Sequence, residues 1–345
     1  MKKDGWKSEL DPQRILFIRP SALGDVCRSV PVIASLKQKW PNSTIDWLVQ
    51  DSLAAAISDH PALSNVLRFP RQQLKRWYLP NGFLKTRRFL KELRLNKYDL
   101  VLDGQGLGRS GLFSLATRSP IRIGFATARE GGKYGYTKQV NAKSIHTVDR
   151  MLELVEAAGA TPLRDMRLYT NAKDKDWWSE RRTSLGIKNY AVIAPTSRWK
   201  SKQWPIERFV KVAEFLFKKG IQPIIVGSPQ EKSQVELLSK QQNTLCLLDE
   251  MSIGRLLAVI EHAKIVVAND SAALHISIGF SRPCVGLFGP TDPEKVGPYN
   301  QINSIVSADV DYSKVKYRDK KIGDEIMRQI EVSDVLHKIE ENTHD

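Results

Sequence analysis

The stretch IVVANDSAALHISIGFSRPCVGLFGPTD, residues 265–292, carries the pattern of a strand, a helix and a second strand. Its first apolar run ends at Asn269 and Asp270, a helical segment opens at Ser271, and a second apolar run leads into the turn GPTD. Parallel strands bring their carboxyl ends to one edge of a sheet, so both polar strand ends are expected to face one crevice. A helix N-terminus beside that crevice offers free N–H groups to phosphate.

Two interpretations of this stretch stand side by side. In the first, Asp270 accepts sugar hydroxyls, and His275 projects from the same helix face as Ser271 towards the same ligand. In the second, Asp270 only caps a helix, and His275 is a buried, hydrogen-bonded histidine. Taken alone, the stretch favours the second interpretation, because helix caps are common.

Other segments repeat the arrangement of an apolar run followed by polar residues. PTSRWKSKQWP (195–205) follows residues 190–194, VGSPQE (226–231) follows residues 221–225, and RPSALGDV (19–26) contains an S-x-x-G-D turn. In this order, the motifs resemble those of the ADP-heptose:lipopolysaccharide heptosyltransferases, the family 9 glycosyltransferases of GT-B architecture. The resemblance spreads over nearly the whole chain, and the order of the motifs is more specific than any one of them.

The chain alternates between strand-like and helix-like segments and then restarts the pattern. The strand-like segments are residues 14–19, 44–49, 100–103 and 121–125, then 190–194, 221–226, 245–248, 265–268 and 284–288. The helix-like segments are residues 30–39, 84–95 and 147–158, then 206–219, 231–240, 253–263 and 271–278. This alternation over 345 residues predicts an α/β protein with two doubly wound, Rossmann-like parallel-sheet domains. The resemblance adds that the two domains face a cleft.

The resemblance also assigns roles to the domains. We expect an acceptor-binding domain over residues 1–175 and a nucleotide-sugar-binding domain over residues 186–320. The charged stretch 171–188 is the expected linker between them. A last helix, residues 324–341 of the C-terminal segment 321–345, is expected to pack back on the first domain, as in the resembled family.

Composition limits the class of protein. Hydrophobic residues make up 41% of the chain, and no run approaches the roughly 18 apolar residues of a membrane span. The N-terminus is charged and has no apolar signal core, so we expect a cytoplasmic protein, and we expect it to be a monomer. Cys27, Cys246 and Cys284 are few and far apart, which argues against a disulfide framework or a zinc site.

Charge is distributed unevenly along the chain. Residues 1–180 hold 30 Lys/Arg against 18 Asp/Glu, whereas the remainder holds 23 against 20. The excess peaks over residues 68–97, where ten basic residues interleave with apolar ones and face only Glu92. A basic amphipathic helix is typical of a surface for anionic lipid head groups or nucleic acid. We expect this segment to rest on the anionic inner membrane; the alternative is a solvated helix face packed on a core.

Sugar transfer requires a carboxylate base for the acceptor hydroxyl and a cationic cradle for the leaving diphosphate. The resemblance assigns the base role to Asp25, at the end of the SALGD turn. The alternative is that Asp25 only caps the following helix. The resemblance places the diphosphate against Thr196, Ser197 and Lys202, and the lysine charge makes a metal ion unnecessary. We therefore expect no metal and no cofactor, because the ADP-sugar is a co-substrate.

The resemblance extends to the rest of the donor site. It implies that Glu231 binds the ribose hydroxyls and that Met251 packs by the adenine. The alternatives are a solvated glutamate and an ordinary core methionine. Four residues match the segment that surrounds the heptose and the diphosphate, and these are Asp270, Ser271, Ala272 and His275. Ala272 stands where the family usually has glycine, which changes how closely the donor approaches the backbone there.

The acceptor that the resemblance implies is the inner core of lipopolysaccharide, whose phosphates and acidic sugars pair with Arg or Lys. Arg109, Arg129 and Lys133 lie near predicted strand ends and are the expected acceptor-binding residues. The alternative for each is an exposed, solvated charge. The predicted function is inverting, metal-independent transfer of a heptose, or a related sugar, from an ADP-sugar to an anionic glycolipid. The enzyme is expected to associate peripherally with the inner membrane.

Two other functions fit single features of the sequence. GLGRSG (106–111) has the spacing of a dinucleotide-binding turn, as in NAD-dependent dehydrogenases, but no acidic residue lies roughly 20 positions on to hold the ribose. The D-x-Q-G-L pattern of the resembled family, at residues 103–107, accounts for the same segment better. A net charge of +15 suits a non-catalytic nucleic-acid-binding protein, but the chain resembles no known nucleic-acid module. We therefore expect no nucleic-acid partner.

Overall fold

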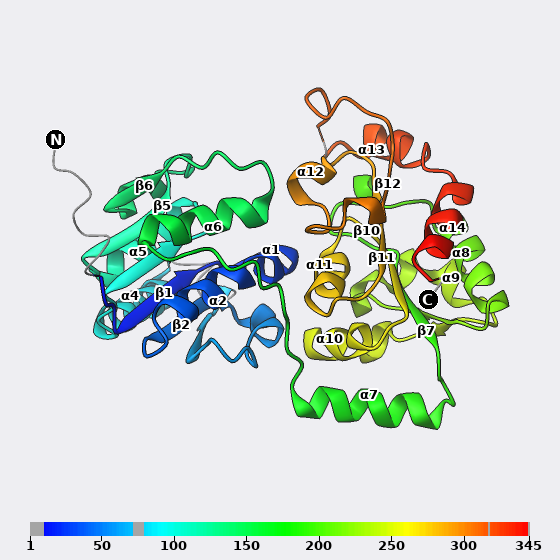
Figure 1. Ribbon diagram of the computed structural model, residues 1–345, viewed down its shortest axis with the longest axis horizontal. Helices are drawn as coiled ribbons and strands as arrows, with labels where there is room; N and C mark the ends of the chain where they lie inside the picture. Colours follow the sequence, from blue (N-terminus) through cyan, green and yellow to red (C-terminus); the bar gives the residue numbers. More distant parts are fainter. Residues whose placement is uncertain (1–9, 72–78, 317, 344–345) are drawn as a thin grey trace. The chain divides into compact units, whose positions relative to one another are not determined.

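The structure is a computed structural model that describes residues 10–71, 79–316 and 318–343. The chain divides into two compact units, Met1–Met166 and Arg167–Asp345, so the division falls ahead of the domain end expected at residue 175. Each unit contains a six-stranded parallel sheet with helices packed against it (Figure 1). The predicted fold class, two doubly wound α/β units, is confirmed.

In the first unit the strand order is β3-β2-β1-β4-β5-β6, and all neighbouring strands are parallel. The strands are β1 (Arg14–Ile18), β2 (Thr44–Gln50), β3 (Asn65–Phe69), β4 (Leu100–Asp103), β5 (Ile121–Phe125) and β6 (Lys138–Val140). The helices are α1 (Leu23–Arg28), α2 (Val30–Lys39), α4 (Pro80–Leu95), α5 (Gly108–Thr117) and α6 (Thr147–Ala158), with short 3₁₀ helices η1 (Asp51–Ala56) and η2 (Gly132–Gly135).

Strand β1 divides the helices of the first unit between two faces of the sheet, because successive side chains of a strand point to opposite faces. Leu16 packs in one cluster with Phe89 of α4 and Phe113 of α5. Phe17, the next residue, lies beside Met151 of α6. Helices α4 and α5 therefore cover one face, and α6 covers the opposite face.

In the second unit the strand order is β12-β11-β10-β7-β8-β9, again with parallel neighbours. The strands are β7 (Tyr190–Ala194), β8 (Gln222–Ile225), β9 (Leu245–Cys246), β10 (Ile265–Asn269), β11 (Cys284–Phe288) and β12 (Ile305–Ser307). The longer helices are α7 (Ala172–Ser184), α8 (Ile206–Lys218), α10 (Ile253–Glu261), α11 (Ala272–Gly279), α13 (Lys320–Met327) and α14 (Val332–Glu341). The shorter ones are α9 (Glu236–Ser239), α12 (Pro293–Val296), η3 (Lys200–Lys202), η4 (Pro229–Gln234), η5 (Leu248–Glu250) and η6 (Ile302–Ser304).

The charged stretch 171–188 is not a linker, as the sequence suggested, but forms helix α7 of the second unit. The side chain of Asn171 caps the helix by accepting a hydrogen bond from the Asp174 backbone at 2.9 Å. Trp178 is buried, and its Nε1 donates to the Tyr190 hydroxyl at 2.9 Å. The buried indole of Trp178 anchors α7 to the second unit, although the rest of this helix is mostly charged. The charge pattern alone did not indicate this contact.

The C-terminal segment packs in the core of the second unit. Met327 of α13 and Ile339 of α14 lie in the same hydrophobic cluster as strand residues of the second sheet. The segment also forms two helices where one was expected. The chain leaves the helical path near Ile330, whose carbonyl accepts hydrogen bonds from Trp204 Nε1, at 3.0 Å, and from the Arg208 guanidinium.

Each sheet has one point at which the strand order reverses. In the first unit this switch point lies between β1 and β4, and in the second it lies between β7 and β10. Ligands of doubly wound proteins bind at the carboxyl ends of the strands that flank such a point. The loops after β1, β4, β7 and β10 are therefore the expected ligand-binding segments.

Candidate functional site

Asp25 follows strand β1 at the first switch point and is the third residue of helix α1. Its carboxylate accepts a hydrogen bond from the Ala22 backbone N–H at 3.1 Å, so it does cap the helix. The same carboxylate pairs with Arg28 Nη2 at 2.7 Å and with Arg19 Nη2 at 3.1 Å. The Asp25 side chain is 29% exposed, so a ligand can still reach it. The cap and a chemical role are thus compatible.

Arg19 and Arg28 form a buried frame around Asp25. Each arginine is 7% exposed. Arg19 also donates to the carbonyl of Gly104, in the loop after β4. Buried guanidinium groups need such partners, because an unpaired charge in the interior is strongly destabilising. The frame fixes the orientation of the carboxylate and leaves the cluster with one net positive charge.

The loop after β4 completes this switch point. Asp103 is fully buried and accepts hydrogen bonds from Gln105 N at 2.8 Å and from the Tyr136 hydroxyl at 2.7 Å. Burial raises the pKa of the Asp103 carboxyl above its usual value. Gln105 Oε1 accepts from Ser21 N at 3.3 Å, which ties this loop to the turn that carries Asp25. The residues of the D-x-Q-G-L pattern therefore support the turn that carries Asp25.

Gly108 and Gly111 serve packing, whereas Gly106 has a positive φ of 66°. A Cβ built at Gly111 would collide with the backbone of Gly132 in η2, and a Cβ at Gly135 would collide with Gly111 in turn. A Cβ at Gly108 would overlap the carbonyl of Glu130. Close backbone contact with the segment 130–135 explains the spacing that resembled a dinucleotide-binding turn.

The second switch point begins with a buried asparagine. Asn269, the last residue of β10, donates from Nδ2 to the Pro195 carbonyl at 2.6 Å, and its Oδ1 accepts from Trp204 N at 3.0 Å. Both partners belong to the segment after β7. Ser197 Oγ donates to the Asp270 carbonyl at 3.1 Å and closes the same contact. The loops after β7 and β10 are thus fixed to one another.

Lys202 of η3 extends into this junction and pairs with Asp270. The Lys202 Nζ to Asp270 Oδ2 distance is 2.6 Å, and the two side chains are 14% and 9% exposed. Thr291 Oγ1 donates to the same Asp270 oxygen at 2.8 Å. The role of Thr291 was missed from the sequence, although its GPTD turn was noted at the adjacent strand end. Thr196, 7% exposed, and Ser197, 9% exposed, lie beside this pair.

Helix α11 begins at the same place. Its first residue is Ala272 and its N-cap is Ser271, whose Oγ is buried and has no hydrogen-bond partner in the described part of the chain. The first N–H groups of a helix have no partner within the helix. His275 is 3% exposed, so it lies inside the fold under this N-terminus. The structure thus brings the helix N-terminus to the Lys202 and Asp270 pair.

Glu231 and Met251 lie on the neighbouring loops. Glu231 Oε2 accepts hydrogen bonds from Ser228 N at 2.7 Å and Ser228 Oγ at 2.8 Å. A Cβ built at Gly227 would lie 3.3 Å from Glu231 Oε2 and 3.4 Å from Thr196 Oγ1, so these two side chains border one small space. Met251 follows η5, is half-buried, and belongs to a segment packed against η4.

Helix α13 supports the loop that carries Lys202, and nothing in the sequence indicated this contact. A Cβ built at Gly323 would collide with Ser201 in η3. A Cβ at Gly289 would collide in the same way with Met327 of α13. The Arg318 guanidinium stacks over the Trp199 ring at 4.9 Å from its centroid. Arg318 and Gly323, which lie far along the chain from η3, thus support the loop that carries Lys202.

The three expected acceptor-binding residues lie on adjoining segments of the first unit. Arg109, in the first turn of α5, is exposed and lies 5.6 Å from the Phe69 ring centroid. Arg129 is exposed, and its backbone N donates to Gly106 O at 2.9 Å. Lys133 belongs to η2, which packs against α5. The structure brings all three to the corner formed by the loop after β4 and the segment 129–135.

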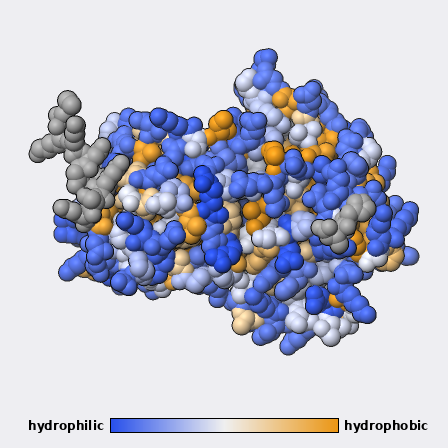
Figure 2. Space-filling view, in the orientation of Figure 1, coloured by the Kyte–Doolittle hydropathy of each residue, from blue (hydrophilic) through white to orange (hydrophobic). Residues whose placement is uncertain are grey.

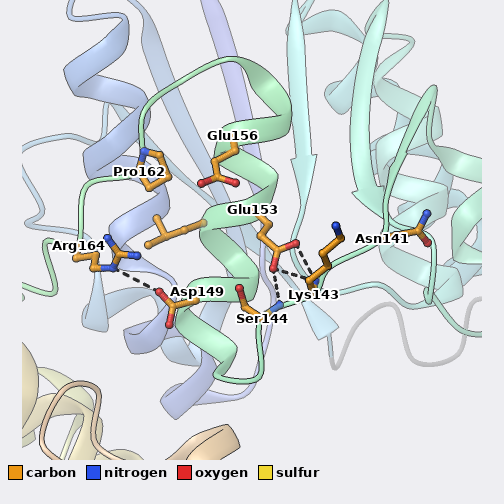
Figure 3. Close-up of a pocket in the computed structure, with 9 residues that line it drawn as sticks. Asn141, Lys143, Ser144, Asp149, Glu153, Glu156, Pro162 and Arg164 are labelled. Atoms are coloured by element: carbon orange, nitrogen blue, oxygen red, sulfur yellow. Dashed lines mark hydrogen bonds and ion pairs between the residues drawn. The ribbon is translucent and has the colours of Figure 1, made fainter.

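A separate polar pocket of about 540 Å³ lies beside α6 (Figure 3). Three carboxylates of one helix face line it, and these are Asp149, Glu153 and Glu156. Asp149 pairs with Arg164 at 3.4 Å, and Glu153 accepts from the backbone of Ser144 at 2.7 Å. Burial works against ionisation of Glu153, but the hydrogen bonds from Ser144 and Lys143 outweigh it and lower the pKa of this carboxyl. Such an acidic lining is unsuited to an anionic ligand.

Within residues 10–71, 79–316 and 318–343, no three His, Cys, Asp or Glu side chains are grouped as a metal site would require. A membrane-crossing helix is also absent there, because none of the described helices combines the length and the apolar character that crossing needs.

Residues 86–324 match the family model for glycosyltransferase family 9 (heptosyltransferase). The chain belongs to this family. It is 27% identical over 302 residues to lipopolysaccharide heptosyltransferase 1 of Escherichia coli K12, an alignment that covers 86% of this chain and 93% of that protein. It is 24% identical over 343 residues to the lipopolysaccharide core heptosyltransferase OpsX of Haemophilus influenzae, which covers 94% and 95% of the two chains.

Among solved structures, the E. coli heptosyltransferase WaaC with ADP matches with a TM-score of 0.78 at 25% identity. The match covers 95% of this chain and 99% of WaaC. Family membership and this likeness confirm the resemblance that the order of motifs suggested. The protein is therefore a glycosyltransferase of the heptosyltransferase family with GT-B architecture, and the dehydrogenase alternative is set aside.

Proposed function

We propose that this family member is an inverting transferase that moves a heptose, or a related sugar, from an ADP-sugar to the inner core of lipopolysaccharide or a related anionic glycolipid. The observation that carries the proposal is the chemistry of the two switch points. One presents a carboxylate framed by arginines, and the other presents a lysine, hydroxyls and a helix N-terminus. The donor class is supported by the likeness to WaaC, which has been solved with ADP and with ADP-2-deoxy-2-fluoro heptose.

On the donor side, the lysine and the helix N-terminus bind the diphosphate. Lys202 supplies a positive charge and Thr196 supplies a hydroxyl donor. Ser197, whose hydroxyl donates to the Asp270 carbonyl, holds this segment against the diphosphate. The unpartnered Ser271 Oγ and the first N–H groups of α11 add donors of the kind that phosphate oxygens accept. As the bond from the anomeric carbon to the diphosphate breaks, these groups stabilise the charge that develops on the leaving ADP. The cationic lysine makes a metal ion unnecessary for this step.

The other groups of the second switch point select the donor. Glu231, beside Thr196, accepts hydrogen bonds from the ribose hydroxyls, and Met251 packs against the adenine. Asp270 orients Lys202 through their 2.6 Å ion pair. His275, buried beneath the N-terminus of α11, supports the segment around the sugar from inside the fold, with Ala272 at the start of the helix. Thr291 holds Asp270 in orientation through the 2.8 Å hydrogen bond described above.

On the acceptor side, Asp25 acts as the general base. It takes the proton of the acceptor hydroxyl while that oxygen forms the new bond to the anomeric carbon. ADP departs from the opposite side of the ring, so the configuration at that carbon is inverted. Arg19 and Arg28 are positioning residues, because they orient the carboxylate and lie too deep to contact the sugar themselves.

The acceptor in this proposal is an anionic glycolipid. Arg109, Arg129 and Lys133 lie at one corner beside the crevice, and the Asp25 cluster itself carries one net positive charge. Phosphate or carboxylate groups of the acceptor would pair with these cations. Because such an acceptor is anchored in lipid, we also propose that the enzyme works as a cytoplasmic monomer associated peripherally with the inner membrane.

A donor screen tests the proposal. Purified protein is incubated with lipid A carrying Kdo and with ADP-heptose, ADP-glucose or UDP-glucose, and the products are analysed by mass spectrometry. The proposal predicts that one heptose is added from ADP-heptose and that ADP-glucose is a poorer donor or none. Transfer from UDP-glucose alone, or release of ADP without any glycolipid product, would contradict it.

A further inference from the structure

We infer that the outward face of helices α4 and α5 docks the enzyme on an anionic membrane, with leucine side chains inserted among the lipid head groups. The inference rests on the proposed function, because that function supplies the lipid-anchored acceptor. It concerns a surface that takes no part in the chemistry. Its experiments are therefore separable from those that test transfer.

Large hydrophobic side chains are concentrated on this face. The described residues include thirteen exposed large hydrophobics, and six of them lie on or directly beside α4 and α5. These six are Leu79, Phe83, Leu84, Leu95, Leu112 and Leu115, with exposures from 42% to 65%. Single exposed leucines are ordinary on a protein surface, but six on two adjoining helices are not. Figure 2 shows one face of the molecule, on which hydrophilic residues predominate and hydrophobic residues are scattered among them.

Helical spacing places these residues on the outer side of α4. Its buried residues Gly82, Phe89 and Leu93 face the sheet. Leu84 and Leu95 are eleven residues apart, which is about three turns, and they lie on the side of the helix opposite to that buried face. Arg88 and Lys91 lie between them at the same helical spacing. The outer stripe of α4 thus alternates leucines with cations.

Helix α5 adjoins α4 and continues the surface. The Phe89 and Phe113 ring centroids are 5.3 Å apart, so the two helices pack side by side on one face of the sheet. On the outer side of α5, Leu112 and Leu115 are exposed, and Arg109 precedes Leu112 by one turn. Arg109, an expected acceptor-binding residue, thus lies where this surface meets the acceptor corner.

The charge of this surface matches an anionic membrane. Helix α4 carries five basic residues against Glu92, and α5 carries no acidic residue. None of the five basic residues of α4 forms an ion pair within the described part of the chain, and these five are Lys85, Arg87, Arg88, Lys91 and Arg94. Residues 1–166 hold 27 Lys/Arg against 15 Asp/Glu. Basic side chains beside exposed leucines are typical of helices that lie in the membrane interface.

Only part of the basic segment expected from the sequence contributes to this surface. Arg68 belongs to β3 and pairs with Asp51 at 3.3 Å, and Arg71 donates to Gln50. Lys75 and Arg76 lie outside the described residues. The docking surface is therefore built from α4, which covers residues 80–95 of the basic segment, and from α5.

The surface ends beside the proposed acceptor crevice. Helix α5 starts at Gly108, directly after the loop of β4 that contacts Ser21 through Gln105. A membrane beneath α4 and α5 would therefore lie next to the turn that carries Asp25. A lipid-anchored acceptor could reach that turn without leaving the bilayer.

The test measures sedimentation with vesicles of equal parts phosphatidylglycerol and phosphatidylcholine, which contain no glycolipid. An apolar variant carries Leu84→Gln, Leu95→Gln and Leu112→Gln, and its control carries Leu185→Gln, Leu237→Gln and Ile322→Gln at exposed positions of the second unit. A charge variant carries Arg87→Glu, Arg88→Glu and Lys91→Glu, and its control carries Lys173→Glu, Lys211→Glu and Lys218→Glu. All variants are first compared with wild type by circular dichroism and by activity on a soluble, delipidated acceptor.

We expect the charge variant to bind about 100-fold more weakly, because each basic residue near an anionic surface contributes ~1 kcal/mol. The apolar variant should bind about tenfold more weakly and lose the binding that wild type retains at high salt, since burial of apolar area is not screened. Both controls should bind as wild type does. All four variants should keep activity on the soluble acceptor.

Three results would overturn the inference. Wild-type affinity in the apolar variant would show that no leucine inserts. Equal losses in a variant and its control would show a general effect of composition. Competition by duplex DNA, with the apolar variant unaffected, would make the surface a nucleic-acid site. If wild type binds vesicles but transfers no sugar, the proposed function fails while the docking surface stands.

Discussion

At the first switch point, between β1 and β4, a carboxylate lies between two arginines; at the second, between β7 and β10, a lysine lies against a carboxylate. In the first, Asp25 is 29% exposed while the arginine side chains are 9% exposed. In the second, the lysine is the more exposed partner, with Lys202 at 14% and Asp270 at 9%. The more exposed group is thus a carboxylate at the first switch point and an ammonium group at the second.

The difference in side-chain exposure indicates which member of each ion pair can contact a ligand. The more exposed member of each pair can meet a ligand, whereas the buried member is held by the protein and fixes its partner. A carboxylate that can reach solvent suits a base for a hydroxyl group, and a lysine that can reach solvent suits a phosphate. Substitutions at the exposed members should therefore change chemistry at the first switch point and donor binding at the second.

The largest effect is expected for Asp25→Asn. The amide keeps the shape of the side chain but cannot take a proton, so kcat should fall by about 10²–10⁴. The measurement is the initial rate of heptose transfer at saturating donor and acceptor. Asp51→Asn, which changes an exposed aspartate of the same unit, is the control and should turn over as wild type. Normal turnover by Asp25→Asn would mean that the residue only caps helix α1.

A smaller effect, of a different kind, is expected for Lys202→Gln. Glutamine can still donate to Asp270 but carries no charge, and a hydrogen bond to a charged group contributes about 1.5–3 kcal/mol. The KM for the ADP-sugar should rise roughly 10- to 150-fold. Lys200→Gln, two residues away and exposed, is the matched control. An unchanged KM would remove Lys202 from the donor site.

Gly323→Ala tests whether α13 positions the lysine loop. The added methyl would overlap Ser201 of η3, and overpacking of this kind costs about 1–3 kcal/mol of unfolding free energy. If the loop yields, Lys202 moves and the KM for the donor rises by about tenfold or less. Thermal unfolding and donor KM are measured together, with Lys321→Ala on the exposed side of α13 as control. A loss of stability with no change in KM would make α13 a structural element only.

The smallest effect is expected for Ala272→Gly, which restores the residue usual in the family. Removing one Cβ at the start of α11 lets the sugar approach the backbone more closely, so the KM for ADP-heptose should change only a few-fold. Inhibition by ADP should be unaffected, because the diphosphate contacts do not involve that methyl. A change in ADP inhibition as large as the change in KM would place Ala272 against the diphosphate.

The parts of the fold that the sequence predicted well are the buried parallel strands. Strands β4, β5, β7 and β11 were predicted with the bounds that the structure has. Three of them are short, fully buried runs, and β5 is a short run of mostly apolar residues that contains Arg122. Strands β6 and β12 have three residues each, and β3 carries an exposed Arg68. Each of these three strands is stabilised by pairing with a neighbouring strand. Their own residues do not show the apolar run from which a strand can be predicted.

The site was predictable to the same extent. Asp25, Lys202 and Asp270 stand at strand ends or in the loops after them, where spacing and the family resemblance both pointed. Arg28 was predictable in principle, because it lies three residues after Asp25 in one helix. The contact of Gly323 with Ser201 was not, since it joins segments more than a hundred residues apart and leaves no local trace.

If base catalysis belongs to the first switch point and donor binding to the second, Asp25→Asn should change the rate of transfer without changing the affinity for ADP. Isothermal titration calorimetry on this variant, beside wild type and Lys202→Gln, measures donor-side binding without turnover. We expect Asp25→Asn to bind ADP within a few-fold of wild type and Lys202→Gln to bind it at least about tenfold more weakly. Loss of ADP affinity in Asp25→Asn, or full affinity in Lys202→Gln, would contradict this division of roles.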